Sequence, residues 1–291
     1  MNQAKNDKHA VPSTEMSSKT VHIYEPVAEP ELLKTILSEN IYLFSGQVAI
    51  LCQFAHPALA KGSYKHSNFG ARIPSRLTNT IRFMTAAVYG TQEEKELIFG
   101  IIHKYHARVK GDDYDAKDPE LHKWTAATLF AAFVFVHEAF FGELPRDQQE
   151  ILYKEYAIFG TSLSMPTEMW PATLDDFWDY WNDNIANLEV TDMAHKLSRD
   201  LLYPSSQLPL WMRVSGPVAR VVTTNLLPKR LAREYGLEPA LLSRLQFQFI
   251  TNTIGFSYPN LPLSLRRSLH QAAIDDLKKA TARIKKSGHW S

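Results

Sequence analysis

The chain has 291 residues, of which 45% are hydrophobic and 11% aromatic, so it is long and apolar enough to bury one large core. Its 32 basic and 31 acidic residues leave a net charge of +1, which provides no field to attract nucleic acid or an anionic membrane. We therefore expect no nucleic-acid partner and a small, apolar ligand. The only cysteine, Cys52, cannot form an internal disulfide.

Residues 1–22 are polar and contain no apolar run of the kind found in a signal peptide. We expect a disordered leader there, followed by a single all-helical catalytic domain over residues 23–291. The longest apolar run, residues 126–136, is shorter than the roughly 20 residues of a membrane-spanning helix. It predicts a core helix, and with it a cytoplasmic protein that has no stable membrane anchor. The sequence does not indicate an oligomeric state.

Apolar periodicity predicts helices throughout and no strand of useful length. Proline 57 should kink or end the second helix, and breaks are expected at residues 203–209 and at Gly216-Pro217. The expected helices cover residues 30–39, 42–60, two pieces within 70–111, 119–141, 147–160, 173–184, 218–225, a segment ending near 236, 239–253 and 263–286.

Local signals place two of the helix starts closely. Gly90 suits the left-handed position after a helix, and Thr91 with Glu94 forms a capping box that opens the next one. Asp118 as N-cap with Pro119 in the first turn is the expected start of another helix.

The densest set of polar side chains on apolar helices lies within residues 70–111. Arg76, Asn79 and Thr80 stand at i, i+3 and i+4, so they share one face of a largely apolar helix and predict an active centre. On the following helix His103 and His106 flank a broad apolar face, and one of them could point inward. The alternative is structural: a buried arginine can tie helices together, and such a histidine can be a hydrogen-bonded core residue.

Other candidates are weaker. Cys52 is expected to be a small core residue and not a thiolate ligand, since no positive partner lies near it in sequence. His56, just before Pro57, could face a cofactor or satisfy a freed carbonyl. The acidic loop beginning at Asp113 lacks the glycine and glutamate that a calcium loop requires at its sixth and twelfth positions. His137-Glu138 is expected to be a boundary pair without a chemical role.

A series of short motifs runs in order through residues 40–240. It comprises Gln53, the Ala55-His56-Pro57 triplet, Gly62, the His66-Ser67 pair, Arg76-Leu77, Thr80, the Tyr89-Gly90-Thr91 corner, His106-x-x-Val109-x-Gly111, Tyr114, Ala116, Asp118-Pro119, Trp124, Ala127-Thr128 and NLLPKRLAREYGL near residue 230. The ordered set resembles the rubber oxygenase (latex-clearing protein) and mycophenolic-acid prenyl-chain oxygenase family.

The resemblance implies an all-helical protein with one non-covalent b-type haem in a buried pocket. By this match His106 is the proximal iron ligand, Arg76 and Thr80 line the distal or propionate side, and His56 is a further candidate for cofactor contact. Two positions depart from the family. Asn79 stands where rubber-cleaving members carry a lysine that can cap the distal iron, and Ala126 stands where many members have a histidine.

The implied activity is that of a haem-dependent oxygenase of secondary metabolism. It would use dioxygen as co-substrate and cleave a carbon-carbon double bond in a prenyl or terpenoid-like chain, although no general base can be assigned. The departures at Asn79 and Ala126 motivate an alternative, a haem-free cyclase or dehydratase on the same scaffold. Two others are a haem-binding sensor or carrier without turnover, and a zinc site built on His103 and His106 with a third ligand.

Overall fold

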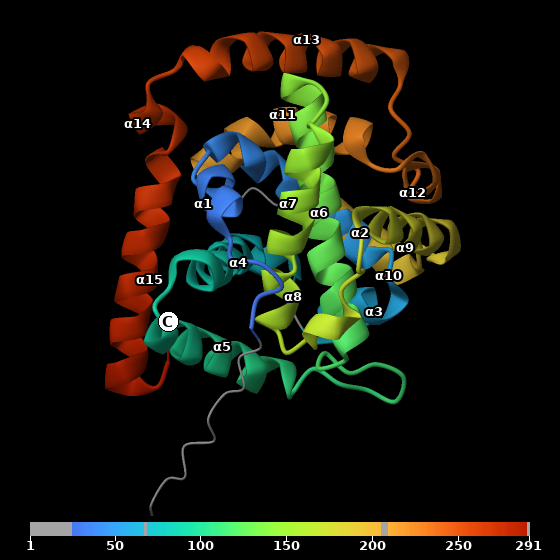
Figure 1. Ribbon diagram of the computed structural model, residues 1–291. Coiled ribbons are helices and arrows are strands. Elements are labelled where there is room, and N and C mark those ends of the chain that lie inside the picture. Colours follow the sequence, from blue (N-terminus) through green and yellow to red (C-terminus); the bar gives the residue numbers. More distant parts are fainter. Residues whose placement is uncertain (1–24, 67–68, 205–208, 290–291) are drawn as a thin grey trace, which may run out of the picture.

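The computed structural model describes residues 25–66, 69–204 and 209–289, and these residues form an all-helical protein (Figure 1). The only extended pairing among them is an isolated bridge between Lys110 and Asp115. The predicted fold class is therefore confirmed. The expected leader at residues 1–22 and part of the break at 203–209 lie outside the described residues.

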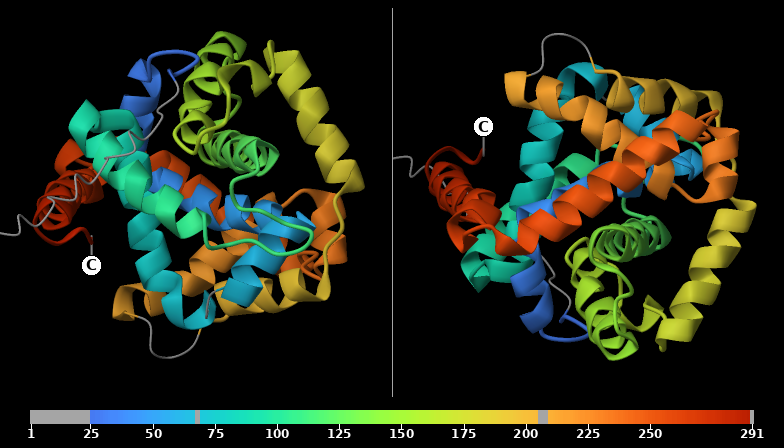
Figure 2. Two further views of the ribbon diagram at one scale, coloured as in Figure 1. Left: turned by 90° about the horizontal axis from the view of Figure 1, so that it is seen from below. Right: turned by 90° about the horizontal axis from the view of Figure 1, so that it is seen from above.

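A long central helix, α6 (Pro119–Phe141), organises the core. Asp118 caps its start by accepting a hydrogen bond from the backbone N–H of Glu120 at 3.0 Å, with Pro119 in the first turn, as the sequence predicts. Because α6 is apolar on nearly all sides, it is covered by other helices on most of its surface (Figure 2). Its neighbours are α2 (Ser45–Phe54), α7 (Arg146–Tyr156), α8 (Ile158–Thr161) and α13 (Leu241–Ser257).

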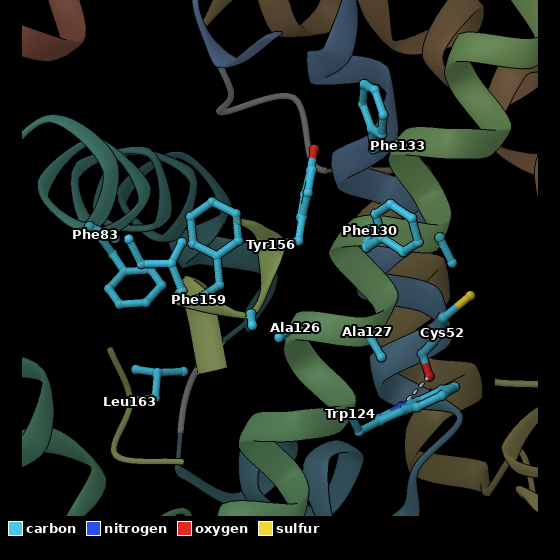
Figure 3. Close-up of a cluster of buried hydrophobic side chains, with 14 of the residues drawn as sticks. Cys52, Phe83, Trp124, Ala126, Ala127, Phe130, Phe133, Tyr156, Phe159 and Leu163 are labelled. Atoms are coloured by element: carbon cyan, nitrogen blue, oxygen red, sulfur yellow. Dashed lines mark hydrogen bonds between the residues drawn. The ribbon is translucent and has the colours of Figure 1, made fainter. Parts of the chain in front are cut away.

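Aromatic side chains fill the space around α6 (Figure 3). Phe130 and Phe133 each pack on Tyr156 of α7, with ring centroids 5.5 and 5.6 Å apart. Trp124 donates a hydrogen bond from Nε1 to the carbonyl oxygen of Cys52 at 3.2 Å, which ties α6 to α2. Such pairs add to the apolar burial that drives the fold.

Helix α6 is the one described helix that is long and apolar enough to cross a membrane by itself, and 61% of its most apolar window is buried inside the protein. The pair Glu31–Leu37 and Asn40–Phe54 passes the same test only as one span bent by 80°. The burial of α6 fits the core helix of a soluble protein, as the sequence predicts.

The segment with the candidate residues forms two helices, α4 (Phe69–Tyr89) and α5 (Gln92–His106), which meet at Gly90. The predicted capping box is present: Thr91 and Glu94 exchange hydrogen bonds at the start of α5. The predicted left-handed conformation of Gly90 is wrong. Glycine is needed because a Cβ at this position would lie 2.5 Å from the carbonyl oxygen of Ala86, so no side chain fits at the corner.

Helix α15 (Ser268–Ser287) packs along both α4 and α5. Arg82 of α4, whose side chain is 7% exposed, pairs with Asp276 of α15 through Nε–Oδ2 and Nη2–Oδ1 contacts of 2.7 and 3.1 Å. The far end of the chain therefore braces the helices that carry the candidate site.

Prolines act as expected at residue 57 but not at residue 217. Helix α2 ends at Phe54 and Pro57 begins α3 (Pro57–His66). The break predicted at Gly216-Pro217 is wrong, because α11 (Leu210–Leu226) continues through it. One missing N–H can be tolerated in a helix whose proline half lies at the surface.

The other helices differ from the predictions in their ends. The expected helix 147–160 is divided into α7 and α8, and the expected helix 263–286 into α14 and α15. The remaining elements are α1 (Glu31–Leu37), η1 (Asn40–Phe44), η2 (Thr167–Met169), α9 (Leu174–Asn187), α10 (Asp192–Leu202), α12 (Lys229–Glu234), η3 (Tyr258–Asn260) and α14 (Leu263–Arg266).

Candidate functional site

His106 is the last residue of α5, and its ring has no hydrogen-bond partner among the described residues. Its Nδ1 atom is fully buried. Burial lowers its pKa to about 4, helped by the nearby charges of His122, His103 and Arg76. The imidazole is therefore neutral at pH 7, which leaves a nitrogen lone pair available to a metal or a proton donor.

His122 of α6 lies beside this ring and was not among the sequence candidates. The two imidazoles stack with centroids 5.9 Å apart and planes inclined by 27°. The Nε2–H of His122 donates to the carbonyl oxygen of Ala116 at 2.9 Å, while its Nδ1 is buried without a partner. Its place in the first turns of α6, directly after the loop that follows His106, was the signal that could have identified it.

Arg76 of α4 is near enough to His106 for its positive charge to lower the pKa of that histidine. The guanidinium lies over the ring of Phe69, 5.1 Å from its centroid, and forms no ion pair with a described carboxylate. Its side chain is exposed, yet burial and the neighbouring charge of Arg72 lower its pKa. The lowered pKa reflects protein packed around part of a side chain that still reaches solvent.

Asn79 and Thr80 differ in their environments. The Oδ1 of Asn79 accepts a hydrogen bond from Nη1 of Arg82 at 3.0 Å, so its carbonyl side belongs to the brace between α4 and α15. Thr80 is exposed, one helical turn after Arg76 on the same face of α4. The structure thus keeps Thr80 beside Arg76 and directs the oxygen of Asn79 away from them.

His56 occupies the break between α2 and α3. Its Nδ1 is buried without a partner, and burial lowers its pKa, whereas the charge of Asp118 raises it. No described contact joins His56 to Arg76 or His106. Its part in cofactor binding therefore stays a prediction.

His103 is engaged elsewhere. Its Nε2 lies 3.3 Å from the hydroxyl of Ser164, a residue held in the left-handed region with φ 76°. No group of three histidine, cysteine or acidic side chains suited to a metal ion is present among the described residues. The zinc hypothesis therefore gains no third ligand from this part of the chain.

The other candidates have structural partners. Cys52 is fully buried and burial strongly raises the pKa of its thiol, so it is a core residue as predicted. His137 pairs through Nδ1 with the hydroxyl of Tyr42 at 3.0 Å. Asp113 of the acidic loop pairs with Lys61 at 2.6 Å.

Several motif residues far apart in sequence meet around Tyr114. Its ring lies against Gly111, where a Cβ would come within 2.4 Å of Cε1, and it is also close to Gly62. Its hydroxyl is 2.7 Å from Nε2 of His66. The Gly111 N–H donates to the Tyr114 carbonyl at 2.8 Å, which turns the loop after His106, and the contacts of Tyr114 with Gly62 and His66 pack this loop on α3. These contacts fix the direction in which the chain leaves His106.

A sequence model of the family described as ER-bound oxygenase mpaB/B'/Rubber oxygenase, catalytic domain, matches residues 33–256. The chain belongs to this family. It therefore carries an oxygenase catalytic domain, which supports an enzyme that uses oxygen.

Two curated relatives share 27% identity over 197 residues, which is 66% of this chain and 74% of theirs. They are the uncharacterized proteins Mb2261 of Mycobacterium bovis and Rv2237 of Mycobacterium tuberculosis. No solved structure gives a significant match.

Ala126, the second departure from the family pattern, is fully buried in α6. A Cβ added to Gly160 of α8 would lie 3.4 Å from the Cβ of Ala126 and 2.8 Å from the sulfur of Met165. Small side chains therefore let α6 and α8 pack closely here, and a histidine at position 126 would need space that Gly160 and Met165 occupy.

Proposed function

We propose that this protein is a haem b-dependent oxygenase of secondary metabolism that cleaves a carbon-carbon double bond of an apolar, prenyl or terpenoid-like substrate in the cytoplasm. The observation that carries the proposal is the neutral His106, which has no hydrogen-bond partner among the described residues and lies within the electrostatic influence of Arg76, which has no carboxylate partner among them. Membership of an oxygenase family supports it.

The residues present fit a haem. A neutral imidazole is the usual nitrogen ligand of haem iron, and His106 is neutral at pH 7 without a competing described hydrogen bond. Arg76 has no carboxylate partner of its own among the described residues, so it can pair with a propionate. Buried apolar residues of α4 and α5, among them Phe83, Phe99 and Ile101, support a dry setting for a porphyrin.

When bound, the haem would supply the redox chemistry that activates dioxygen. The protein residues would hold the haem and orient the substrate beside it. His106 would hold the iron, and its stacked neighbour His122, anchored on the Ala116 carbonyl, would limit rotation of its ring. Thr80 would offer a hydroxyl to a water or to the substrate, and Asn79 would offer its amide N–H₂ while its oxygen stays on Arg82.

The reaction is balanced without a further reductant: one double bond and one dioxygen give two carbonyl groups, each with one oxygen atom. The test is to incubate haem-loaded protein with an isoprenoid alkene such as squalene under ¹⁸O₂, trap the carbonyls at once by reduction, and analyse them by mass spectrometry. We expect paired products that each carry one ¹⁸O. Haem-loaded protein that yields no product across a series of isoprenoid alkenes would contradict the proposal and favour a sensor or carrier.

A further inference from the structure

Helix α13 carries apolar side chains on both of its sides. Its inner side chains Phe247, Ile250 and Ile254 pack against the small core around Val136 and Phe140. A broad apolar face of a helix is normally buried. Viewed from above, however, α13 lies in front of the other described helices with its outer side uncovered (Figure 2).

The outer face of α13 consists of Leu241, Leu242, Leu245, Phe249 and Phe256, which are 73%, 67%, 54%, 72% and 82% exposed. At about 100° per residue these five side chains project within one sector of roughly 100°, which the exposed Asn252 shares, so they form a largely apolar stripe about 22 Å long. The chain that follows exposes four more leucines, Leu261, Leu263, Leu265 and Leu269. An apolar surface of this extent marks a binding site.

The packing of α13 holds this stripe outward. A Cβ at Gly255 would lie 2.1 Å from the carbonyl oxygen of Phe140, so the backbone of α13 rests directly on the end of α6. Thr251 is buried on the same inner side. The helix therefore cannot rotate to bury Phe249 and Phe256 without losing this close contact.

Arginines are the charged residues of the segment that carries the stripe, and Glu238, just before it, pairs with Arg233 at 3.6 Å. No aspartate or glutamate occurs from Pro239 to Ile274, whereas arginines stand at 244, 266 and 267. Arg266 and Arg267 share the single carboxylate of Glu39, at 2.9 Å each, which leaves one positive charge in excess there. Arg244 has no carboxylate partner among the described residues and donates to the carbonyl of Pro239. Although the whole chain is almost neutral, the segment from Pro239 to Ile274 itself carries positive charge.

We propose that the outer face of α13 docks on an anionic phospholipid surface, with α13 parallel to the membrane and Phe249 and Phe256 inserted among the acyl chains. Large apolar side chains on one face, bordered by arginines, are the pattern of helices that lie in the lipid interface. A second copy fits less well, because a stripe one helix wide is narrow against the roughly 20 to 30 residues a side of a stable protein interface. The proposal does not depend on the proposed oxygenase activity.

The test is co-sedimentation of the full chain with vesicles of phosphatidylcholine alone or mixed with phosphatidylglycerol. We expect binding to the mixed vesicles, about fivefold weaker binding without the anionic lipid, and a loss of at least about tenfold in Phe249→Gln/Phe256→Gln. The control is Ile151→Gln on α7, which removes an exposed apolar side chain (48% exposed) away from the stripe and should bind as the parent does.

Three outcomes would overturn the proposal. The parent protein could stay in the supernatant with both kinds of vesicle, or Ile151→Gln could lose as much binding as the double variant. Light scattering could also find a dimer that becomes a monomer in Phe249→Gln/Phe256→Gln, which would assign the stripe to a second copy. Absorption spectra recorded on the same samples keep any change in haem content separate from membrane binding.

Discussion

Arg76 is the charged residue with the clearest unfilled role, because it is desolvated and has no carboxylate partner among the described residues. If it pairs with a haem propionate, Arg76→Ala should weaken haem binding by about 10- to 100-fold while the axial-ligand spectrum stays the same. Haem titration of the apoprotein measures this. Arg72→Ala, one turn earlier on α4, removes the same charge from an exposed position and should change the affinity little. An equal loss of haem affinity in both variants would mean that Arg76 acts only through its positive charge and not by pairing with a propionate.

His106 should make the haem-free protein sensitive to acid. Its pKa is about 4 in the folded protein against 6.5 in an ordinary setting, so the unfolded chain takes up the proton first as pH falls. Its contribution to stability is unchanged above about pH 6.5, is lost progressively between 6.5 and 4, and is constant below. We expect His106 to account for at most about 2 kcal/mol of the loss between pH 7 and 5.

Urea unfolding of the haem-free parent and of His106→Gln at pH 7 and pH 5 isolates the contribution of His106, since the other buried histidines titrate in both proteins. The difference between pH 7 and pH 5 should be smaller in the variant. An identical difference would mean that the ring is freely protonated in the folded state.

At the scale of elements, the loop after α5 decides where His106 points. Gly111→Ala would place a Cβ within 2.4 Å of Tyr114 and force that ring from its position beside Gly62 and His66. We expect about 1–3 kcal/mol of destabilisation and weaker haem binding. The control is Gly216→Ala in α11, where nothing lies within 4 Å of the added Cβ and helix propensity predicts a neutral or slightly stabilising effect. Urea unfolding and haem titration of both variants check this, and wild-type behaviour of Gly111→Ala would show that the loop does not position His106.

Features that depend on neighbouring residues could be predicted from the sequence. The caps at Thr91 and Asp118 need only residues two or three positions away, and both are found where the sequence places them. Gly90 was identified as special, but for a left-handed backbone it does not adopt, since the constraint is the carbonyl of Ala86. The helix through Pro217 was missed because a proline's cost depends on what packs around it.

The long-range contacts of the site could not be predicted in this way. The stacking of His122 on His106 joins two helices across a loop, and the Arg82–Asp276 pair spans 194 positions. The family resemblance supplied Arg76, Thr80 and His106 as a set, and the structure brings Arg76 within the electrostatic influence of His106. Asn79 shows what spacing alone cannot predict. Its spacing places it on the same helix face as Arg76 and Thr80, but its side-chain oxygen accepts a hydrogen bond from Arg82.

At the scale of the whole molecule, α15 braces α4 through Arg82 and Asp276. Asp276→Ala would leave a guanidinium that is 7% exposed without its carboxylate, so we expect about 2–4 kcal/mol of destabilisation in urea unfolding. Asp275→Ala is the matched control, because Asp275 is exposed and accepts only a hydrogen bond from Gln271. It should cost under about 0.5 kcal/mol. Equal losses of stability in Asp276→Ala and Asp275→Ala would show that the ion pair between Asp276 and Arg82 does not hold α15 against α4.

The proposed function requires that the fold holds one haem through His106. The most direct measurement is the absorption spectrum from the Soret region to the red, with the haem identified and counted after reduction in alkaline pyridine, for the parent, His106→Ala and His103→Ala. We expect about one b-type haem per chain in the parent and in His103→Ala, and loss of haem in His106→Ala. Full haem content with an unchanged spectrum in His106→Ala, or no haem in a parent protein produced with added haem precursor, would contradict it.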